Sequence, residues 1–193
     1  EDLELVSTPG TAYLYSNIGM SLLGLVLAER TGRPYEAMLQ DGICRPLGMT
    51  GTTTDLAAVR DRVVPGLKTG GTRFPNQFMA ALTPAGGIYS SAEDLARLAR
   101  TEIAATDPAI ALSQRPVFTI AEGERVALGW HVYDWAQGWR TLNHNGGIGG
   151  YTSSLYVDTA NQCAAAVLSN VMNEGEFGEA VRALARTLLQ QLE

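Results

Sequence analysis

Apolar residues recur at helical spacing near the start of the chain. Ile18, Leu22, Leu25 and Val26 follow one another at intervals of one to four positions, the spacing that places side chains on one face of an α-helix. The run ends at Gly32, a residue type common just after a helix C-terminus. The pattern therefore predicts a buried helix that begins just after Tyr15.

A second helix and a long irregular segment are predicted next. Pro34 favours a helix start, so we expect a helix over about 35–42, ended by the Pro-Leu-Gly-Met turn at 46–49. Residues 51–87 are rich in Gly, Thr and Pro and show little periodicity. This composition indicates an irregular surface segment, and long loops of this kind are often functional.

The residues from Ser90 to Asp94 have the composition of a helix N-terminus. The hydroxyls of Ser90 and Ser91 can accept hydrogen bonds from the first backbone N–H groups, and the carboxylates of Glu93 and Asp94 favour the positive end of the helix dipole. A third helix is therefore predicted, with an inner face formed by Leu95, Leu98 and Ala99.

The pattern changes after Pro116, where short runs with strand propensity replace helical spacing. Turn residues such as Ala136-Gln137-Gly138 separate these runs. The predicted strands of an antiparallel meander are 126–135, 140–145, 151–158 and 162–170. Helical spacing then returns at Phe177, Val181, Leu184, Leu188 and Leu192. We therefore predict an α+β fold, with a mainly helical and loop region at 1–115 followed by antiparallel strands and a terminal helix at 116–193.

Composition and charge exclude several classes of protein. The chain has 193 residues, of which 46% are apolar, enough for one domain with a sizeable core. Its net charge is −6, and the 14 basic residues are scattered along the chain, which argues against a nucleic-acid partner. The most apolar run, 18–28, is too short to span a bilayer.

Neither the cysteines nor the first residues fix the compartment. Cys44 and Cys163 lie far apart, and the chain has only two histidines, so a zinc site is not expected. Two buried thiols are the favoured interpretation, with a disulfide as the alternative in an exported protein. The acidic start Glu1-Asp2-Leu3-Glu4 does not resemble a signal peptide. The protein is then cytoplasmic, or it is periplasmic or secreted if a signal peptide lies upstream.

Tyr15-Ser16-Asn17 is the first candidate for chemistry. Tyr15 and Asn17 are two positions apart at the entry to the first helix, so both side chains can project toward one side. A tyrosine acts as a general base only if a nearby cation lowers its pKa from about 10. The alternative interpretation makes Asn17 a helix cap and Tyr15 an ordinary half-buried ring.

His144-Asn145-Gly146-Gly147 is the second candidate. It ends a predicted strand and is followed by Ile148-Gly149-Gly150. Glycines allow another backbone or a substrate to approach closely, and a free N–H on such an edge can serve an oxyanion hole. His144 could supply a charge or a hydrogen bond there. The alternative is a glycine-rich hairpin with an incidental histidine.

Together with several further motifs in order, the two candidates resemble the class C β-lactamase and penicillin-binding-protein family. This family includes β-lactamases, D-Ala-D-Ala peptidases, D-amino-acid amidases and carboxylesterases, and the resemblance extends over essentially the whole chain. The motifs that carry it are Pro9-Gly10-Thr11, Tyr13-Leu14-Tyr15-Ser16-Asn17, Pro46-Leu47-Gly48-Met49-Thr50, Ala85-Gly86-Gly87-Ile88-Tyr89-Ser90-Ser91, Asp94-Leu95-Ala96-Arg97 and His144-Asn145-Gly146-Gly147.

The resemblance implies acyl transfer through a serine ester, without a metal or organic cofactor. In the family a Ser-x-x-Lys serine attacks the carbonyl carbon, and the motif tyrosine, here Tyr15, shuttles protons. Asn17 matches the asparagine that hydrogen-bonds the substrate amide or supports the lysine. His144 stands where many relatives have lysine. The resemblance places Gly146 and Gly147 in the substrate-binding strand, and Gly147 matches the residue whose N–H supplies half of the oxyanion hole.

The chain departs from the family at its nucleophile. Lys68 is the only lysine, and the position three before it is Pro65, so Ser-x-x-Lys is absent. Lys68-Thr69-Gly70 spells another family motif but is followed by loop residues and lies between the wrong landmarks. Ser21 lacks the glycine that completes a nucleophile elbow, so we interpret it as a packing residue.

We therefore expect a single β-lactamase-like domain, residues 1–193, that lacks its N-terminal part. The expected substrate is a small ester, amide or β-lactam, and the missing segment is a candidate partner if it exists as a separate chain. The alternative is a truncated relative that binds a ligand or a partner without catalysis. A third hypothesis, another serine such as Ser90 or Ser153 as nucleophile, has no support from spacing. Without the missing segment we expect uncovered apolar surface, an open sheet edge and low stability.

Overall fold

Helices and loops form the first part of the structure. The computed structural model describes residues 4–75, 79–135, 138–172 and 176–192; Ala136 and Gln137, predicted above as turn residues, lie outside these ranges. The helical elements of this part are α1 (Asn17–Thr31), α2 (Tyr35–Leu39), the π-helix η1 (Gln40–Cys44), α3 (Arg45–Leu47), α4 (Leu56–Val59), the 3₁₀-helix η2 (Ala80–Leu82), α5 (Thr83–Gly86), α6 (Ala92–Ala104) and α7 (Pro108–Ser113).

Six antiparallel strands follow and form one sheet. Each strand pairs with the next along the chain, so the order in the sheet is the order in the sequence. The strands are β1 (Phe118–Ala121), β2 (Glu124–Val126), β3 (His131–Asp134), β4 (Arg140–Ile148), β5 (Tyr151–Asp158) and β6 (Cys163–Ser169). The chain ends with helix α8 (Glu176–Gln190). The predicted α+β fold is confirmed.

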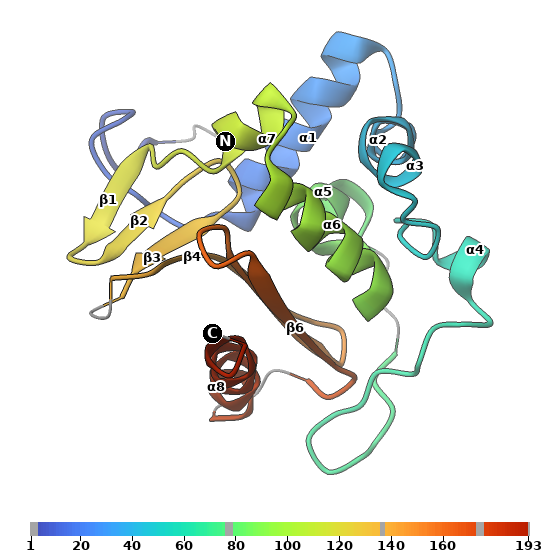
Figure 1. Cartoon of the computed structure of the whole chain (residues 1–193). Helices are drawn as coiled ribbons and strands as arrows, with labels where there is room; N and C mark the ends of the chain where they lie inside the picture. Colours follow the sequence, from blue (N-terminus) through green and yellow to red (C-terminus); the bar gives the residue numbers. More distant parts are fainter. Residues whose placement is uncertain (1–3, 76–78, 136–137, 173–175, 193) are drawn as a thin grey trace.

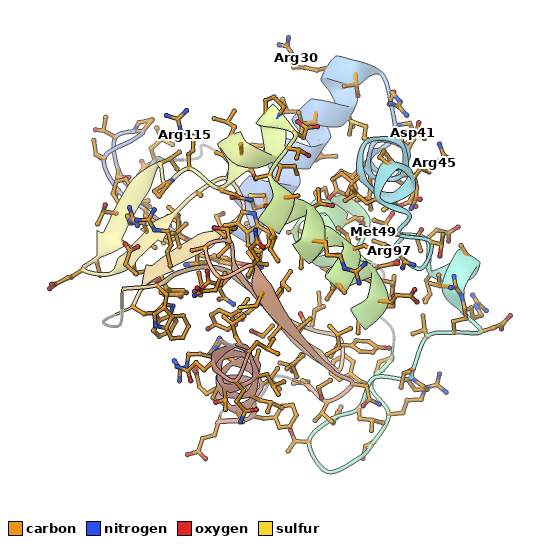
Figure 2. The ribbon with its side chains drawn as sticks, viewed as in Figure 1. Arg30, Asp41, Arg45, Met49, Arg97 and Arg115 are labelled. Atoms are coloured by element: carbon orange, nitrogen blue, oxygen red, sulfur yellow. The ribbon has the colours of Figure 1, made fainter. Side chains whose placement is uncertain are left out.

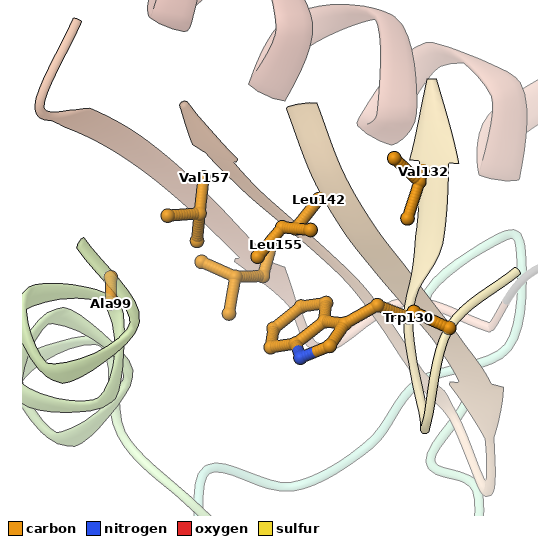
Figure 3. Close-up of a cluster of buried hydrophobic side chains, with 7 residues drawn as sticks. Ala99, Trp130, Val132, Leu142, Leu155 and Val157 are labelled. Carbon is orange, nitrogen blue, oxygen red and sulfur yellow. The ribbon is translucent and has the colours of Figure 1, made fainter. Parts of the chain in front are cut away.

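Helices cover the two faces of this sheet. α8 lies across one face and α6 lies on the other (Figure 1). Strand alternation explains the arrangement, because successive side chains point to opposite faces. Leu142, Leu155 and Val157 pack with Trp130 and Ala99 on the α6 side (Figure 3). Tyr156 packs with Ala185 and Leu189 on the α8 side.

The second predicted helix continues farther than expected. Instead of ending near Gly42, the chain stays helical through a π-helical turn to Leu47, and Gly48 then ends it with φ of 69°. Cys44 and Met49 are buried in a small apolar cluster at this corner. Figure 2 shows Met49 close to Arg97 of α6, while Asp41 and Arg45, which form an ion pair, face outward.

Two local predictions hold at helix ends, and a side chain fixes one of the turns between strands. Gly32 caps α1 in the left-handed conformation with φ of 64°. The Ser91 hydroxyl accepts a hydrogen bond from the Asp94 N–H at 3.2 Å and so caps α6. Asp158 accepts hydrogen bonds from the N–H groups of Ala160 and Asn161, each at 2.9 Å, and so fixes the turn between β5 and β6.

Two other predictions are wrong. The predicted strand at 126–135 is a hairpin: β2 ends at Val126, β3 begins at His131, and the Ala127 N–H donates to the Trp130 carbonyl oxygen at 2.8 Å. Gly129 permits this turn with φ of 87°. Helix α1 is not buried. Only Ser21 and Gly24 are fully covered, and Ile18 and Leu22 are 76% and 59% exposed.

The predicted irregular segment at 51–87 is held at both ends. Thr53 pairs with Tyr89 in an isolated β-bridge. Within the segment, Leu67 donates its N–H to the Asn170 carbonyl oxygen at 2.8 Å. The short helices α4, η2 and α5 interrupt the segment, and α5 packs against α1 through Pro84 and Gly24. The loop is therefore fixed against both α1 and the end of the sheet.

Candidate active site

The tyrosine motif lies in the extended segment just before α1. Ser16 is the N-cap of α1, with extended φ and ψ of −145° and 109°, and its hydroxyl accepts a hydrogen bond from the Gly19 N–H at 2.9 Å. Asn17 is the first helical residue, so the interpretation of Asn17 as the cap is wrong. Tyr15 is 56% exposed and Asn17 is also exposed. The cap therefore occupies Ser16, while the side chains on either side of it face solvent.

The histidine motif lies on β4, the longest strand. His144 is exposed, and its ring Nδ1 lies 2.9 Å from the Asn145 carbonyl oxygen. A carbonyl oxygen can only accept, so Nδ1 carries a hydrogen and Nε2 of the neutral ring is left as an acceptor. Desolvation by the surrounding protein lowers the pKa of His144, and the nearby His131 adds to this effect, although the bond to Asn145 opposes it. The lowered pKa favours the neutral form of His144.

One edge of β4 is open beside the motif. β4 pairs with β5 through Ile148, but its pairing with β3 ends at Asn143. No other strand in the described part of the chain pairs with that edge from 144 to 148. Gly146 and Gly147 lie on this stretch, and a Cβ at Gly146 would meet the Ser153 hydroxyl at 2.6 Å. An unpaired N–H at such an edge can donate to a developing oxyanion.

A buried polar layer supports the strand below the motif. Asn145 Oδ1 accepts hydrogen bonds from the Ser154 hydroxyl at 2.7 Å and from Asn143 Nδ2 at 3.3 Å. Asn143 Nδ2 also donates to the Leu155 carbonyl oxygen at 2.8 Å. Because Asn143 and Asn145 alternate with His144 along the strand, they point to the opposite face. Asn145 therefore supports β4 from the face opposite His144, although it belongs to the same motif.

The glycines after the motif accommodate another backbone. Gly150 has φ of 85°, and a Cβ there would lie 2.8 Å from the Gly66 carbonyl carbon. The Tyr151 hydroxyl donates to the Val64 carbonyl oxygen at 2.7 Å and ties the loop to β5. The close approach that the glycines predict is thus a loop contact at Gly150, whereas the stretch at 146–147 lies on the open edge.

Ring contacts connect the two motifs. Tyr13, two residues before Tyr15, makes an edge contact with His131 of β3 at a centroid distance of 6.2 Å. The His131 ring lies 6.4 Å from the ring of His144. The N-terminal segment and β4, more than a hundred residues apart, thus meet at His131. No motif contains His131. The sequence could have pointed to it only because it is the other of the two histidines and lies in the strand before β4.

Other residues singled out in the sequence lie elsewhere. The Lys68 ammonium sits 5.9 Å from the Phe74 ring centroid within the loop, and Ser21 is buried with its hydroxyl bonded to the Asn17 carbonyl oxygen at 2.8 Å. Trp130, Trp135 and Trp139, which belong to no motif, pack in the two apolar cores. Cys44 and Cys163 are not joined in a disulfide.

Among the described residues there is neither a metal site nor a membrane-spanning helix. No three His, Cys, Asp or Glu side chains in this part of the chain lie close enough together to hold a metal ion. None of its helices is both long and apolar enough to cross a membrane.

The fold and the two motifs together define a β-lactamase or transpeptidase type of protein, with helices before an antiparallel sheet and a closing helix. The β-lactamase family model matches residues 1–190. The chain belongs to this family.

Individual relatives agree with this assignment. The D-alanyl-D-alanine-carboxypeptidase/endopeptidase AmpH of Escherichia coli K12 is 34% identical over 94 residues, which cover 49% of this chain and 24% of AmpH. The octameric penicillin-binding protein homologue of Pyrococcus abyssi is 25% identical with a TM-score of 0.82, covering 96% of this chain and 44% of that one. A class C β-lactamase, 17% identical, shares the fold with a TM-score of 0.85 and covers 99% and 60%. The chain thus spans between 24% and 60% of the length of these three relatives.

Proposed function

We propose that this chain is part of a serine hydrolase that forms an acyl-enzyme on an ester, a peptide-like amide or a β-lactam. Its nucleophile belongs to a Ser-x-x-Lys segment outside these 193 residues, so that the chain is a β-lactamase-like domain without its N-terminal part. The relatives named above support the reaction class. The chain itself contributes Tyr15, Asn17, His144, Gly146 and Gly147.

The exposure of α1 is the observation that carries this proposal. A helix that is apolar on all sides is normally buried, yet α1 leaves most of its apolar residues exposed. They are Ile18, Met20, Leu22, Leu23, Leu25, Val26 and Leu27. A segment that covers α1 would lie beside Tyr15 and Asn17, which stand at the start of the same helix. This is the position from which a serine could reach the candidate site.

Each residue then has a role in one reaction. The serine oxygen attacks the substrate carbonyl carbon, and its proton passes to the Tyr15–lysine pair. N–H groups of the serine and of Gly147 stabilise the oxyanion. The leaving group departs with the proton, and water attacks the ester to release the acid and the serine. Asn17 and the neutral His144 orient the substrate, and Gly146 lets it approach β4.

Acylation tests the proposal. The longest polypeptide that the gene encodes around these residues and the 193-residue chain alone are each incubated with a fluorescent penicillin and with a fluorescent phosphonate ester. We expect labelling of the longer polypeptide, removed by changing its Ser-x-x-Lys serine to alanine, and no labelling of the chain alone.

A non-catalytic binding domain is the alternative. It would be favoured if the longer polypeptide folds but neither probe labels it and no ester is turned over. Labelling of the chain alone would instead favour another nucleophile, and Ser90→Ala and Ser153→Ala would then identify it.

A further inference from the structure

A second histidine with an acidic partner lies beside the candidate site. His131 Nδ1 is 3.2 Å from Glu124 Oε1, and the same oxygen accepts a hydrogen bond from the Tyr133 hydroxyl at 3.3 Å. The β2–β3 register places Glu124 opposite Tyr133, and the Tyr133 ring stacks on the His131 ring at 6.1 Å. The imidazole is therefore held by a carboxylate at its edge and a phenol ring at its face.

His131 and Glu124 are partly shielded from solvent. The side chains of His131 and Glu124 are 23% and 32% exposed, so solvent screens them less than a fully exposed pair. On its remaining sides His131 contacts Tyr13 and His144. It is thus the point where the strand motif meets the segment that bears Tyr15.

We propose that Glu124 and His131 are positioning residues of the candidate site, a role that rests on the function proposed above. Glu124 fixes the His131 ring. That ring in turn sets the distance between the Tyr13–Asn17 segment and β4, and a proton on it disfavours a second positive charge on His144. This adds to the desolvation that favours neutral His144, a hydrogen-bond acceptor. The titratable groups that face His131 are Glu124, Tyr133 and His144 from the sheet and Tyr13 from the N-terminal segment.

The proposal can be tested without any turnover, because the chain has only two histidines. NMR titration of the 193-residue chain resolves both imidazoles. His131→Phe keeps a ring of similar bulk but removes the titratable imidazole, so the pKa of His144 should rise because repulsion from a protonated His131 is lost. The backbone signals of residues 13–17 should shift as well. Tyr35→Phe, which removes a phenol from α2, is the matched control and should leave both readouts unchanged.

A second variant separates position from charge. Glu124→Gln keeps the shape of the partner but removes its charge, so the His131 ring signals and those of Tyr13 should broaden or shift. If His131→Phe does not fold by circular dichroism, His131→Gln replaces it with the same expectation for His144. The proposal is wrong if the folded variant leaves the His144 midpoint and the signals of residues 13–17 where they are in the parent chain. That result would leave the acyl-transfer function itself untouched, because acylation is measured separately.

Discussion

His144 differs chemically from the lysine that many relatives carry at this position. A lysine ammonium is always positive near pH 7, whereas the pKa of His144 is lowered and its Nε2 is an acceptor at that pH. A substrate carboxylate would therefore meet no positive charge from this residue. An uncharged ester or amide suits the neutral ring better.

This difference predicts a pH-dependent preference between substrates. His144 becomes cationic only when the pH falls through its lowered pKa, so an anionic β-lactam should bind better relative to a neutral ester at acid pH than at pH 8. At pH 8, His144→Lys should raise the kcat/KM for the anionic β-lactam relative to that for the neutral ester by about tenfold, which corresponds to roughly 1.4 kcal/mol. The ratio of the two kcat/KM values in the longer polypeptide measures this effect and cancels pH effects common to both substrates. An equal ratio at both pH values would contradict the prediction.

Tyr15 should be essential if the proposed chemistry is right. Tyr15→Phe removes only the hydroxyl, and loss of a general acid–base group typically costs about a hundredfold or more in rate. We expect kcat for ester hydrolysis to fall by about that factor while the fold is unchanged, because the side chain is exposed. Ser21→Ala is the control, since its hydroxyl bonds only within α1. Similar losses in both variants would point to a structural effect.

Motif spacing could single out Tyr15, Asn17 and His144 as candidates, because these residues are recognised by their neighbours in sequence. It could not locate His131 or the support given by Asn143 and Ser154. Those roles depend on which strands pair and in which register, and a one-residue change of register would turn each side chain to the other face.

Among the elements, helix ends set by neighbouring residues could be predicted from the sequence, whereas contacts between distant residues could not. The start of α6 follows from the Ser91 hydroxyl and two carboxylates in its first turn. The β2–β3 hairpin was missed because its turn contains Ala127, Leu128 and Trp130, which have no turn propensity, and only Gly129 marks it. Uncovered apolar surface was expected, but its location on α1 could not be predicted, because an apolar helix has the same sequence pattern whether or not another segment covers it.

The contact between α1 and α5 can be tested at a single glycine. A Cβ at Gly24 would lie 2.3 Å from Pro84 Cγ, so Gly24→Ala should force the two helices apart. We expect a loss of about 1–3 kcal/mol in the free energy of unfolding, although alanine favours the helix by about 1 kcal/mol. Gly42→Ala, with no atom within 4 Å of the new Cβ, is the matched control and should be neutral or stabilising. Urea denaturation measures both.

For the whole molecule, the question is what the apolar surface of α1 does. Leu22 and Val26 lie one turn apart and are both exposed, on the side of α1 away from the buried Ser21 and Gly24. If α1 is covered by a further segment, the chain alone should be poorly stable and prone to associate through this surface.

Replacing Leu22 and Val26 together by glutamate should therefore have opposite effects in two contexts. In the 193-residue chain it removes exposed apolar surface, so solubility should rise and the unfolding midpoint should change little, because surface changes usually stay within about 0.5 kcal/mol. In the longer polypeptide it would bury two charges without partners, so acylation should be lost. Sedimentation velocity and the penicillin label measure the two outcomes. If the longer polypeptide tolerates both glutamates, α1 is an ordinary surface helix, and the segment that completes the site must lie elsewhere.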